Sequence, residues 1–279
     1  MNMDLIPHSA LRAPRSSPRV VILTGGADNL PARHLVAELA RAGMAPAAVL
    51  IDPLRRRRPE REPAVKQKYL IYLRHGMLRY AFKKFTRGLR RRFGARLRLD
   101  LPELPTLGAQ NHIPVQWIDN VNEPEGLKAL RALEPDVLIM MGCRILKAPV
   151  LAVPRLALNF HTGILPYYRG ADTIYWAMKN GEPQRVGYSI HEGVEALDAG
   201  RVFFEEAVPP EPGELLEDIY ARLVRRATPH WPELLRQYQA LGELPGRALD
   251  LEAGRLYKAA DWWAHAQLEN AWLSKGGTR

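Results

Sequence analysis

The chain has 279 residues, 47% of them hydrophobic and 25% charged, so it can bury a full core as one large domain or two small ones. A single cysteine, Cys143, excludes an intramolecular disulfide framework and is typical of a reducing compartment. The net charge of +10 is local, because residues 55–98 hold 17 Lys and Arg against two Glu and the rest of the chain is net acidic. No stretch approaches the ~20 apolar residues of a membrane span, and residues 1–18 lack the apolar run of a secretory signal. We therefore expect a disordered N-terminal tail, no membrane span and a cytoplasmic location.

The first elements predict a βαβ unit. Residues 19–24 form a short β-branched run that stops at Gly25-Gly26, a helical pattern follows from Asn29, and residues 45–51 form a second strand. A glycine turn that faces a helix N-terminus can hold an anion, so Gly25 and Gly26 are candidate substrate-binding residues. The third glycine of a dinucleotide fingerprint is missing and Asp28 would repel a phosphate, so a purely structural turn is an equal alternative.

Residues 53–108 interrupt the βα alternation and form an expected basic helical insertion. Within it, apolar residues recur at helical spacing over 70–93, which predicts a long basic amphipathic helix. This helix could bind a phosphorylated substrate, nucleic acid or an anionic lipid surface. Alternatively, its apolar stripe packs on the main domain while its arginines face water. The second interpretation is favoured, because no aromatic residues are interleaved on the basic face of the helix as they are in a single-strand binding platform.

The alternation resumes after the insertion. Residues 113–118 read as a strand, 123–133 as a helix and 137–141 as a strand of five consecutive apolar residues, which is typical of a parallel sheet covered on both faces. That strand ends in the loop 142–146. Because open α/β sheets bind ligands at the carboxyl ends of their strands, this loop is a candidate binding site.

The segment Leu156–His161 predicts the next buried strand. Alternate residues of a strand share a face, so Asn159 and His161 are expected to point into the same space. A later loop carries Asp198, which would complete a group of an amide, an imidazole and a carboxylate. Such a group can polarise a carbonyl, hold an oxyanion and move a proton. Taken singly, each of these residues is more often a hydrogen-bonded turn residue than a catalyst.

The remaining elements complete an α/β pattern. The sequence predicts a loop over 167–172, a helix over 173–180, strands over 185–191 and 200–208, and one or two helices over 215–241 that break near Pro229 and Pro232. A short strand over 255–258 and an aromatic helix follow. The tryptophans of that last helix are expected to pack at the edge of the domain; they are Trp262, Trp263 and Trp272.

Together these residues resemble the folate-dependent formyltransferases, which include methionyl-tRNA, glycinamide ribonucleotide and sugar N-formyltransferases. The matching motifs are, in chain order, Asn159-Phe-His161, Leu165-Pro166, Arg169-Gly170, Asn180-Gly181, Gly187-Tyr-Ser-Ile-His191 and Asp198-Ala-Gly200. The strand and loop from Pro135 to Leu146 are similar as well. The resemblance covers roughly residues 19–51 and 110–208. It implies a Rossmann-like, mostly parallel sheet with helices on both faces.

The resemblance also implies a reaction, in which an amine attacks the formyl carbon of 10-formyltetrahydrofolate. Asn159 would donate an amide hydrogen to the developing oxyanion, and His161 would stabilise that charge and help the folate amine to leave. Asp198 would orient the imidazole and take part, through water, in removing the amine proton. A carboxylate partner favours the charged form of an imidazole, which suits this role.

Binding residues follow from the same resemblance. The pteridine would lie against two segments, namely Cys143, Arg144, Ile145 and Leu146, and Glu192, Gly193, Val194, Glu195 and Ala196. Tyr168 and Arg169 join the glycine turn as candidate substrate-binding residues. His191 is expected to be a structural bracket, and no metal is expected.

The expected domain organisation is a tail over 1–18, a catalytic domain over 19–208 and a mainly helical C-terminal region over 209–279. That region looks too short and too helical for the barrel domain that methionyl-tRNA formyltransferases use on tRNA. We therefore expect a small amine as acceptor, with an amino sugar linked to a nucleotide as first candidate, and no nucleic-acid partner. The alternatives are a glycinamide ribonucleotide formyltransferase, a formyltetrahydrofolate hydrolase and a non-catalytic module that binds through the basic helix. A homodimer is left open.

Overall fold

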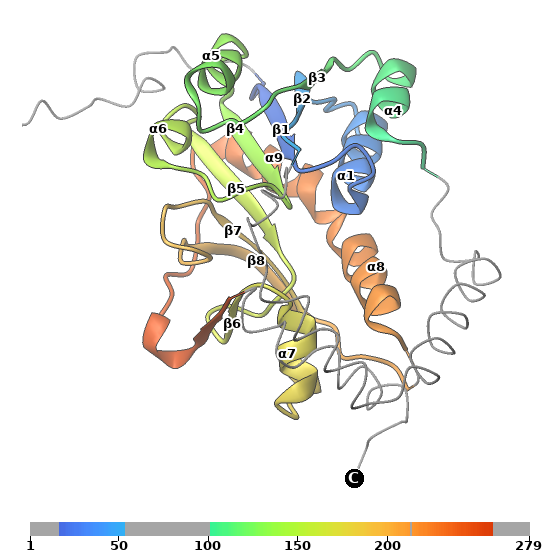
Figure 1. Cartoon of the computed structure of the whole chain (residues 1–279), viewed down its shortest axis with the longest axis vertical. Helices are drawn as coiled ribbons and strands as arrows, with labels where there is room; N and C mark the ends of the chain where they lie inside the picture. Colours follow the sequence, from blue (N-terminus) through green and yellow to red (C-terminus); the bar gives the residue numbers. More distant parts are fainter. Residues whose placement is uncertain (1–16, 54–100, 213, 259–279) are drawn as a thin grey trace, which may run out of the picture.

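A seven-stranded sheet forms the centre of the computed structural model, which describes residues 17–53, 101–212 and 214–258 (Figure 1). The strand order is β3-β2-β1-β4-β5-β7-β8. The five strands from β3 to β5 are parallel, whereas β7 and β8 run antiparallel to their neighbours. The expected Rossmann-like, mostly parallel α/β fold is thus confirmed. The strands are β1 (Val20–Thr24), β2 (Ala48–Ile51), β3 (Val115–Trp117), β4 (Val137–Met141), β5 (Leu156–His161), β7 (Gly187–Glu192) and β8 (Val202–Ala207).

Helices cover both faces of the sheet because the central strands are apolar on both sides. In β1, Val21 and Leu23 pack with residues of α5 and α6, while Val20 and Ile22 pack with residues of α1, α8 and α9. Figure 1 shows these two groups of helices on opposite sides of the strands. The helices are α1 (Leu30–Arg41), α4 (Leu104–Gln110), α5 (Pro124–Ala132), α6 (Ala148–Leu151), α7 (Thr173–Lys179), α8 (Leu216–Ala227) and α9 (His230–Leu241).

Helix α4 begins within the segment predicted as an insertion. It starts at Leu104, inside the segment 53–108 that was expected to interrupt the βα alternation, and packs on α1. A Cβ on Gly108 would lie 2.7 Å from the carbonyl of Ile113, so only glycine lets the helix turn this closely into β3. The predicted long basic helix over 70–93, most of the N-terminal tail and the three C-terminal tryptophans lie outside the described residues.

The C-terminal helices α8 and α9 join the core on the α1 side of the sheet. Trp231, Leu223 and Leu235 are each at most 2% exposed and belong to the same hydrophobic cluster as the strands. The break between the helices falls at residues 228–229, as predicted near Pro229. Pro232, in contrast, lies in the first turn of α9, where a proline needs no hydrogen-bonded N–H. The proposed domain boundary at residue 209 stays a prediction.

A second, two-stranded sheet lies beside α7. It pairs β6 (Tyr168–Gly170) with β9 (Arg255–Tyr257) in parallel. The sequence predicted the later strand but assigned a loop to residues 167–172, because three residues ending in glycine carry no strand periodicity. Two short 3₁₀ turns, η3 (Pro183–Arg185) and η4 (Leu251–Ala253), complete the described elements. Within the described ranges, no helix combines the length and apolar character needed to cross a bilayer.

Candidate active site

The predicted trio of polar residues meets at the carboxyl end of β5. Asn159 and His161 share one face of this strand, and Asp198 reaches them from the loop that follows β7. The distance from His161 Nδ1 to Asp198 Oδ2 is 3.5 Å, and that from Asn159 Nδ2 to Asp198 Oδ1 is 3.4 Å. The structure therefore brings together an amide, an imidazole and a carboxylate separated by up to 39 residues in sequence.

Asp198 is buried and surrounded by donors. Besides the two groups above, its Oδ2 accepts a hydrogen bond of 2.8 Å from the backbone N–H of Gly170. Its backbone is left-handed, with φ of 49°, a conformation that short polar residues such as Asp adopt more readily than most. Burial opposes ionisation of the carboxyl, but the adjacent His161 imidazole, the contact with His191 and the Gly170 N–H together hold its pKa well below the usual range. Asp198 is thus a carboxylate at neutral pH.

His161 is almost fully buried, at 7% exposure, and this changes its expected charge. Its Nε2 donates to the backbone carbonyl of Tyr168 over 2.7 Å, while Nδ1 faces Asp198. Burial lowers the pKa of the imidazole, although Asp198 and the Tyr168 carbonyl act in the opposite direction. Asp198 thus favours the imidazolium, as expected, but burial outweighs this effect in the resting site. If Nδ1 took up a proton, both ring N–H groups would already face an acceptor, namely Asp198 at Nδ1 and the Tyr168 carbonyl at Nε2.

His191 completes the group, which we call the Asp198 cluster: Asn159, His161, His191 and Asp198. Nδ1 of His191 donates to the carbonyl of Glu192 over 2.8 Å, which leaves Nε2 free to accept from Asn159 Nδ2 over 3.0 Å. His191 Nε2 also lies 3.4 Å from Asp198 Oδ1. These contacts suit a structural role for His191. Because its Nε2 accepts from Asn159 Nδ2, His191 determines that the NH₂ end of the Asn159 amide faces the carboxylate.

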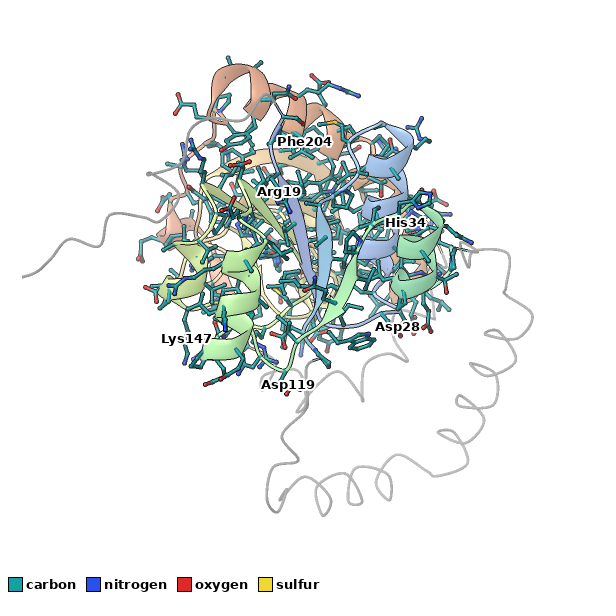
Figure 2. The ribbon with its side chains drawn as sticks, turned by 90° about the horizontal axis from the view of Figure 1, so that it is seen from above. Arg19, Asp28, His34, Asp119, Lys147 and Phe204 are labelled. Atoms are coloured by element: carbon teal, nitrogen blue, oxygen red, sulfur yellow. The ribbon has the colours of Figure 1, made fainter. Side chains whose placement is uncertain are left out.

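The two loops predicted to hold a pteridine lie side by side. Glu195 Oε1 accepts a hydrogen bond of 3.2 Å from the backbone N–H of Ala148, which directly follows the first loop. A Cβ on Gly193 would lie 2.3 Å from the terminal methyl of Met140, so the second loop passes close to this side chain of β4. Figure 2 shows Lys147, at the end of the first loop, on the same side of the molecule as Asp28 and Asp119, which follow β1 and β3.

Residues within these loops differ in what they present to a ligand. Ile145 is 66% exposed and Val194 40% exposed, whereas Leu146 is buried in the core between the sheet and α5. Burial raises the pKa of the Cys143 thiol to about 12, so this group stays protonated and uncharged. Glu192 is paired with Arg201, and its side chain is committed to that contact. The loops therefore offer backbone groups and exposed apolar side chains; Ala196 is exposed as well.

Arg144, the remaining loop residue, is held by a carboxylate that the sequence did not single out. Its guanidinium forms a two-pronged ion pair with Asp52, which is fully buried at the end of β2. Asp52 also accepts from the backbone N–H of Val121 over 2.9 Å. We call these groups the Asp52 brace. It ties together the loops that follow β2, β3 and β4, so the Arg144 side chain acts on the loop rather than on a ligand.

The candidate substrate-binding residues divide into two groups. The turn with Gly25 and Gly26 lies near the first loop, because a Cβ on Gly142 would meet the side-chain amide of Asn29 at 3.0 Å. The side chain of Tyr168 is 1% exposed and its hydroxyl donates to Glu182, whereas its backbone carbonyl reaches the cluster.

Arg169 likewise points away from the cluster. Its Nη2 donates to the carbonyl of Leu251 over 3.4 Å, which directs the guanidinium toward the C-terminal segment. That these two residues bind substrate stays a prediction. Residues 168–170 form a strand, and it is the backbone of this strand that faces the cluster.

Comparison with known families gives this geometry a context. Residues 106–235, which include the whole Asp198 cluster and both loops, match the formyl transferase family. This match covers 130 of the 279 residues. Over 119 residues the chain is 36% identical to methionyl-tRNA formyltransferase of Thermotoga maritima, a match that covers 42% of this chain and 38% of that protein. Over 130 residues it is 32% identical to the methionyl-tRNA formyltransferase of Chlorobium chlorochromatii, covering 46% and 41%. The chain thus spans about two fifths of the length of these relatives.

Solved structures resemble this chain in fold. Glycinamide ribonucleotide transformylase 1 from Symbiobacterium toebii superposes with a TM-score of 0.57 over 84% of this chain and 95% of that chain, at 17% identity. An N-formyltransferase from Helicobacter canadensis, in complex with folinic acid and dTDP-3-aminofucose, gives a TM-score of 0.58 over 88% and 72%, at 14% identity. At these identities the likeness extends to the fold alone.

Proposed function

We propose that the protein is an N-formyltransferase that moves the formyl group of 10-formyltetrahydrofolate to a primary amine of a small molecule. The observation that carries this proposal is the Asp198 cluster, in which Asn159, His161 and Asp198 meet inside the segment that matches the formyl transferase family. The cluster lies at the carboxyl end of β5, where open α/β sheets bind ligands. A reducing cytoplasm, where such donors are metabolised, fits the single protonated cysteine.

The two loops support a folate as formyl donor. Ile145, Val194 and Leu197 are 66%, 40% and 38% exposed, and apolar side chains held out in this way can lie against a flat heterocycle. The contact between Glu195 and the Ala148 N–H holds the loops in one relative position. We assign pteridine binding to these side chains and to the backbone of residues 143–146. An enzyme of similar fold, from Helicobacter canadensis, was solved in complex with folinic acid, which supports a folate-type donor.

Asn159 would stabilise the oxyanion. When the amine nitrogen bonds to the formyl carbon, the carbonyl oxygen gains a negative charge and needs a donor. Both hydrogens of Asn159 Nδ2 have partners in the resting site, at 3.0 Å in His191 and 3.4 Å in Asp198. The hydrogen that makes the longer bond, to Asp198, would bind the oxyanion instead, while the bond to His191 keeps the amide in place. One such donor typically contributes ~2.7 to 4 kcal/mol of transition-state stabilisation.

Asp198 and His161 would handle the proton. The attacking amine must lose one proton, and the donor nitrogen must gain one as its bond to the formyl carbon breaks. Asp198 is ionised at neutral pH and can accept the amine proton through water. His161 starts neutral, and a proton that it takes up at Nδ1 is stabilised by the adjacent carboxylate. The pair can therefore pass one proton from the amine to the leaving nitrogen, and both residues return to their starting protonation states.

An amino sugar linked to a nucleotide is our first candidate for the acceptor. The turn at Gly25-Gly26 precedes α1, whose N-terminus can bind phosphate oxygens, and it adjoins the first loop. Among proteins of similar fold is the Helicobacter canadensis enzyme in complex with dTDP-3-aminofucose. Methionyl-tRNA is a second candidate acceptor, because the curated relatives above are methionyl-tRNA formyltransferases.

An acceptor screen tests the proposal. The protein is incubated with 10-formyltetrahydrofolate and, in separate reactions, nucleotide-linked amino sugars, glycinamide ribonucleotide and methionyl-tRNA, and release of tetrahydrofolate is followed. We expect release that depends on an amino sugar and disappears in His161→Ala. Release with water alone would identify a hydrolase instead. No release with any acceptor, together with no binding of the folate, would leave the non-catalytic alternative.

A further inference from the structure

Strand β6 is hydrogen-bonded along both of its edges. On one edge, the carbonyl of Tyr168 accepts from His161 Nε2 over 2.7 Å, and the N–H of Gly170 donates to Asp198 Oδ2 over 2.8 Å. Two backbone groups of one short strand therefore hold the two titratable residues of the proposed proton pathway. Neither group could be inferred from side-chain chemistry.

The opposite edge of β6 is covered by β9. The N–H of Arg255 donates to the carbonyl of Tyr167 over 3.1 Å, and the N–H of Ala171 donates to the carbonyl of Tyr257 over 2.8 Å. In an extended strand the backbone groups of successive residues point to opposite edges. Residues 168 and 170 therefore face the cluster while residues 167 and 171 face β9. A strand of three residues is too short to hold its position alone, so this pairing decides where β6 lies.

Close packing fixes β9 in turn. The ring of Tyr257 stacks on Tyr168 at 5.6 Å and on Trp176 at 4.9 Å between centroids, and its hydroxyl accepts from Asn180 Nδ2 over 2.8 Å. A Cβ on Gly254 would lie 1.8 Å from the Pro166 carbonyl, so any side chain there must push the two segments apart. Tyr257 is 5% exposed, which places this contact in the interior.

We propose that strand β9, near the C-terminal end of the described chain, is a positioning element of the active site. By pairing with β6 it aligns the Tyr168 carbonyl with His161 and the Gly170 N–H with Asp198. Its effect on catalysis rests on the proposed formyl transfer, whereas its effect on the histidine does not. A region that looks separate from the chemistry in sequence thus becomes part of the site.

Two substitutions loosen β9 without touching the cluster. Gly254→Ala introduces the clash with Pro166, and Tyr257→Leu removes the aromatic stacking while keeping an apolar side chain. Their matched controls are Ala253→Ser, at an exposed neighbouring position, and Tyr257→Phe, which loses only the bond to Asn180. Thermal unfolding and circular dichroism establish that each variant is folded.

The first readout is the tautomer of His161, measured by nitrogen NMR of the imidazole in the full chain. We expect a single Nε2-protonated neutral form in the wild type and both controls, and a mixture of tautomers in Gly254→Ala and Tyr257→Leu. The second readout is formyl transfer, for which kcat is expected to fall roughly ten- to a hundred-fold in those two variants with little change in the KM of the donor.

The outcomes separate the two proposals. If both folded variants keep the single tautomer, β9 does not position the cluster and the inference is overturned. If the tautomer mixture appears but no acceptor is ever formylated, the positioning role stands and the proposed function fails. Should Gly254→Ala not fold, Tyr257→Leu compared with Tyr257→Phe decides the question by the same spectra.

Discussion

Two buried carboxylates at the carboxyl edge of the sheet have opposite surroundings. Asp52 is fully buried against Arg144, a permanent cation, and against a backbone N–H. Asp198 is 6% exposed and faces two histidines, an amide and a backbone N–H. The partner of Asp52 is a guanidinium that stays charged and cannot pass on a proton, so this carboxylate serves to join loops. A carboxylate held by groups that can themselves gain or release protons is suited to chemistry.

Among the substitutions that test this difference between Asp198 and Asp52, Asp198→Asn is expected to have the largest effect on kcat. The change keeps the shape of the side chain and removes the charge that receives the proton, so we expect kcat for formyl transfer to fall by roughly 10³- to 10⁴-fold. Steady-state kinetics on the acceptor found in the screen measure this loss. Asp52→Asn is the matched control, for which kcat is expected to stay within about tenfold. Equal losses in both variants would mean that the two carboxylates do not differ in role.

Asn159→Ala comes next. Loss of the oxyanion donor is expected to lower kcat by roughly 10²- to 10³-fold while the KM of the donor changes little, because the interaction is made only in the transition state. A large rise in KM with unchanged kcat would show that the amide binds ground-state substrate instead. His191→Gln keeps an acceptor for the amide and is the companion variant, with a smaller loss.

Arg144→Met is expected to lower the stability of the protein, whereas the two substitutions above lower kcat. It leaves the buried Asp52 carboxylate without its cation, and since Arg144 is 23% exposed we expect a loss of about 2 to 4 kcal/mol in the free energy of unfolding. Urea unfolding measures it. The double variant Asp52→Asn with Arg144→Met is expected to recover part of the loss, because no unpaired charge remains. A double variant as unstable as Arg144→Met would contradict the claim that Arg144 stabilises the protein through its ion pair with Asp52.

The smallest expected effect concerns pH. Burial, with the nearby charges of Arg33 and Arg225, lowers the pKa of His34, and burial also lowers that of His161. Below about pH 6.5 the unfolded chain therefore binds protons that the folded chain does not, and the free energy of unfolding falls as the pH falls. We expect His34→Gln to remove roughly 1 kcal/mol or less of the decrease between pH 7.5 and 5.5, measured by urea unfolding. An unchanged or steeper decrease would count against this assignment.

Much of the site was predictable because it depends on local geometry. The twofold period of a strand places Asn159 and His161 on one face wherever that strand lies, and the apolar run of β4 predicts a ligand-binding loop at its carboxyl end. Asp198 was a candidate because it lies in a later loop and its motif resembles that of a known family, and the structure places it beside both residues.

The rest was decided by tertiary contacts. The sequence alone determined the mostly parallel α/β fold and the polar residues of β5, since both follow from the pattern of apolar and polar residues along single elements. The structure alone decided that β6 pairs with β9, that Tyr168 and Gly170 act through their backbones, that Asp52 holds Arg144, and that burial keeps His161 neutral. Backbone hydrogen bonds between distant segments and the local polarity around a buried ring leave no period or motif in a sequence, because both depend on how separate elements pack together.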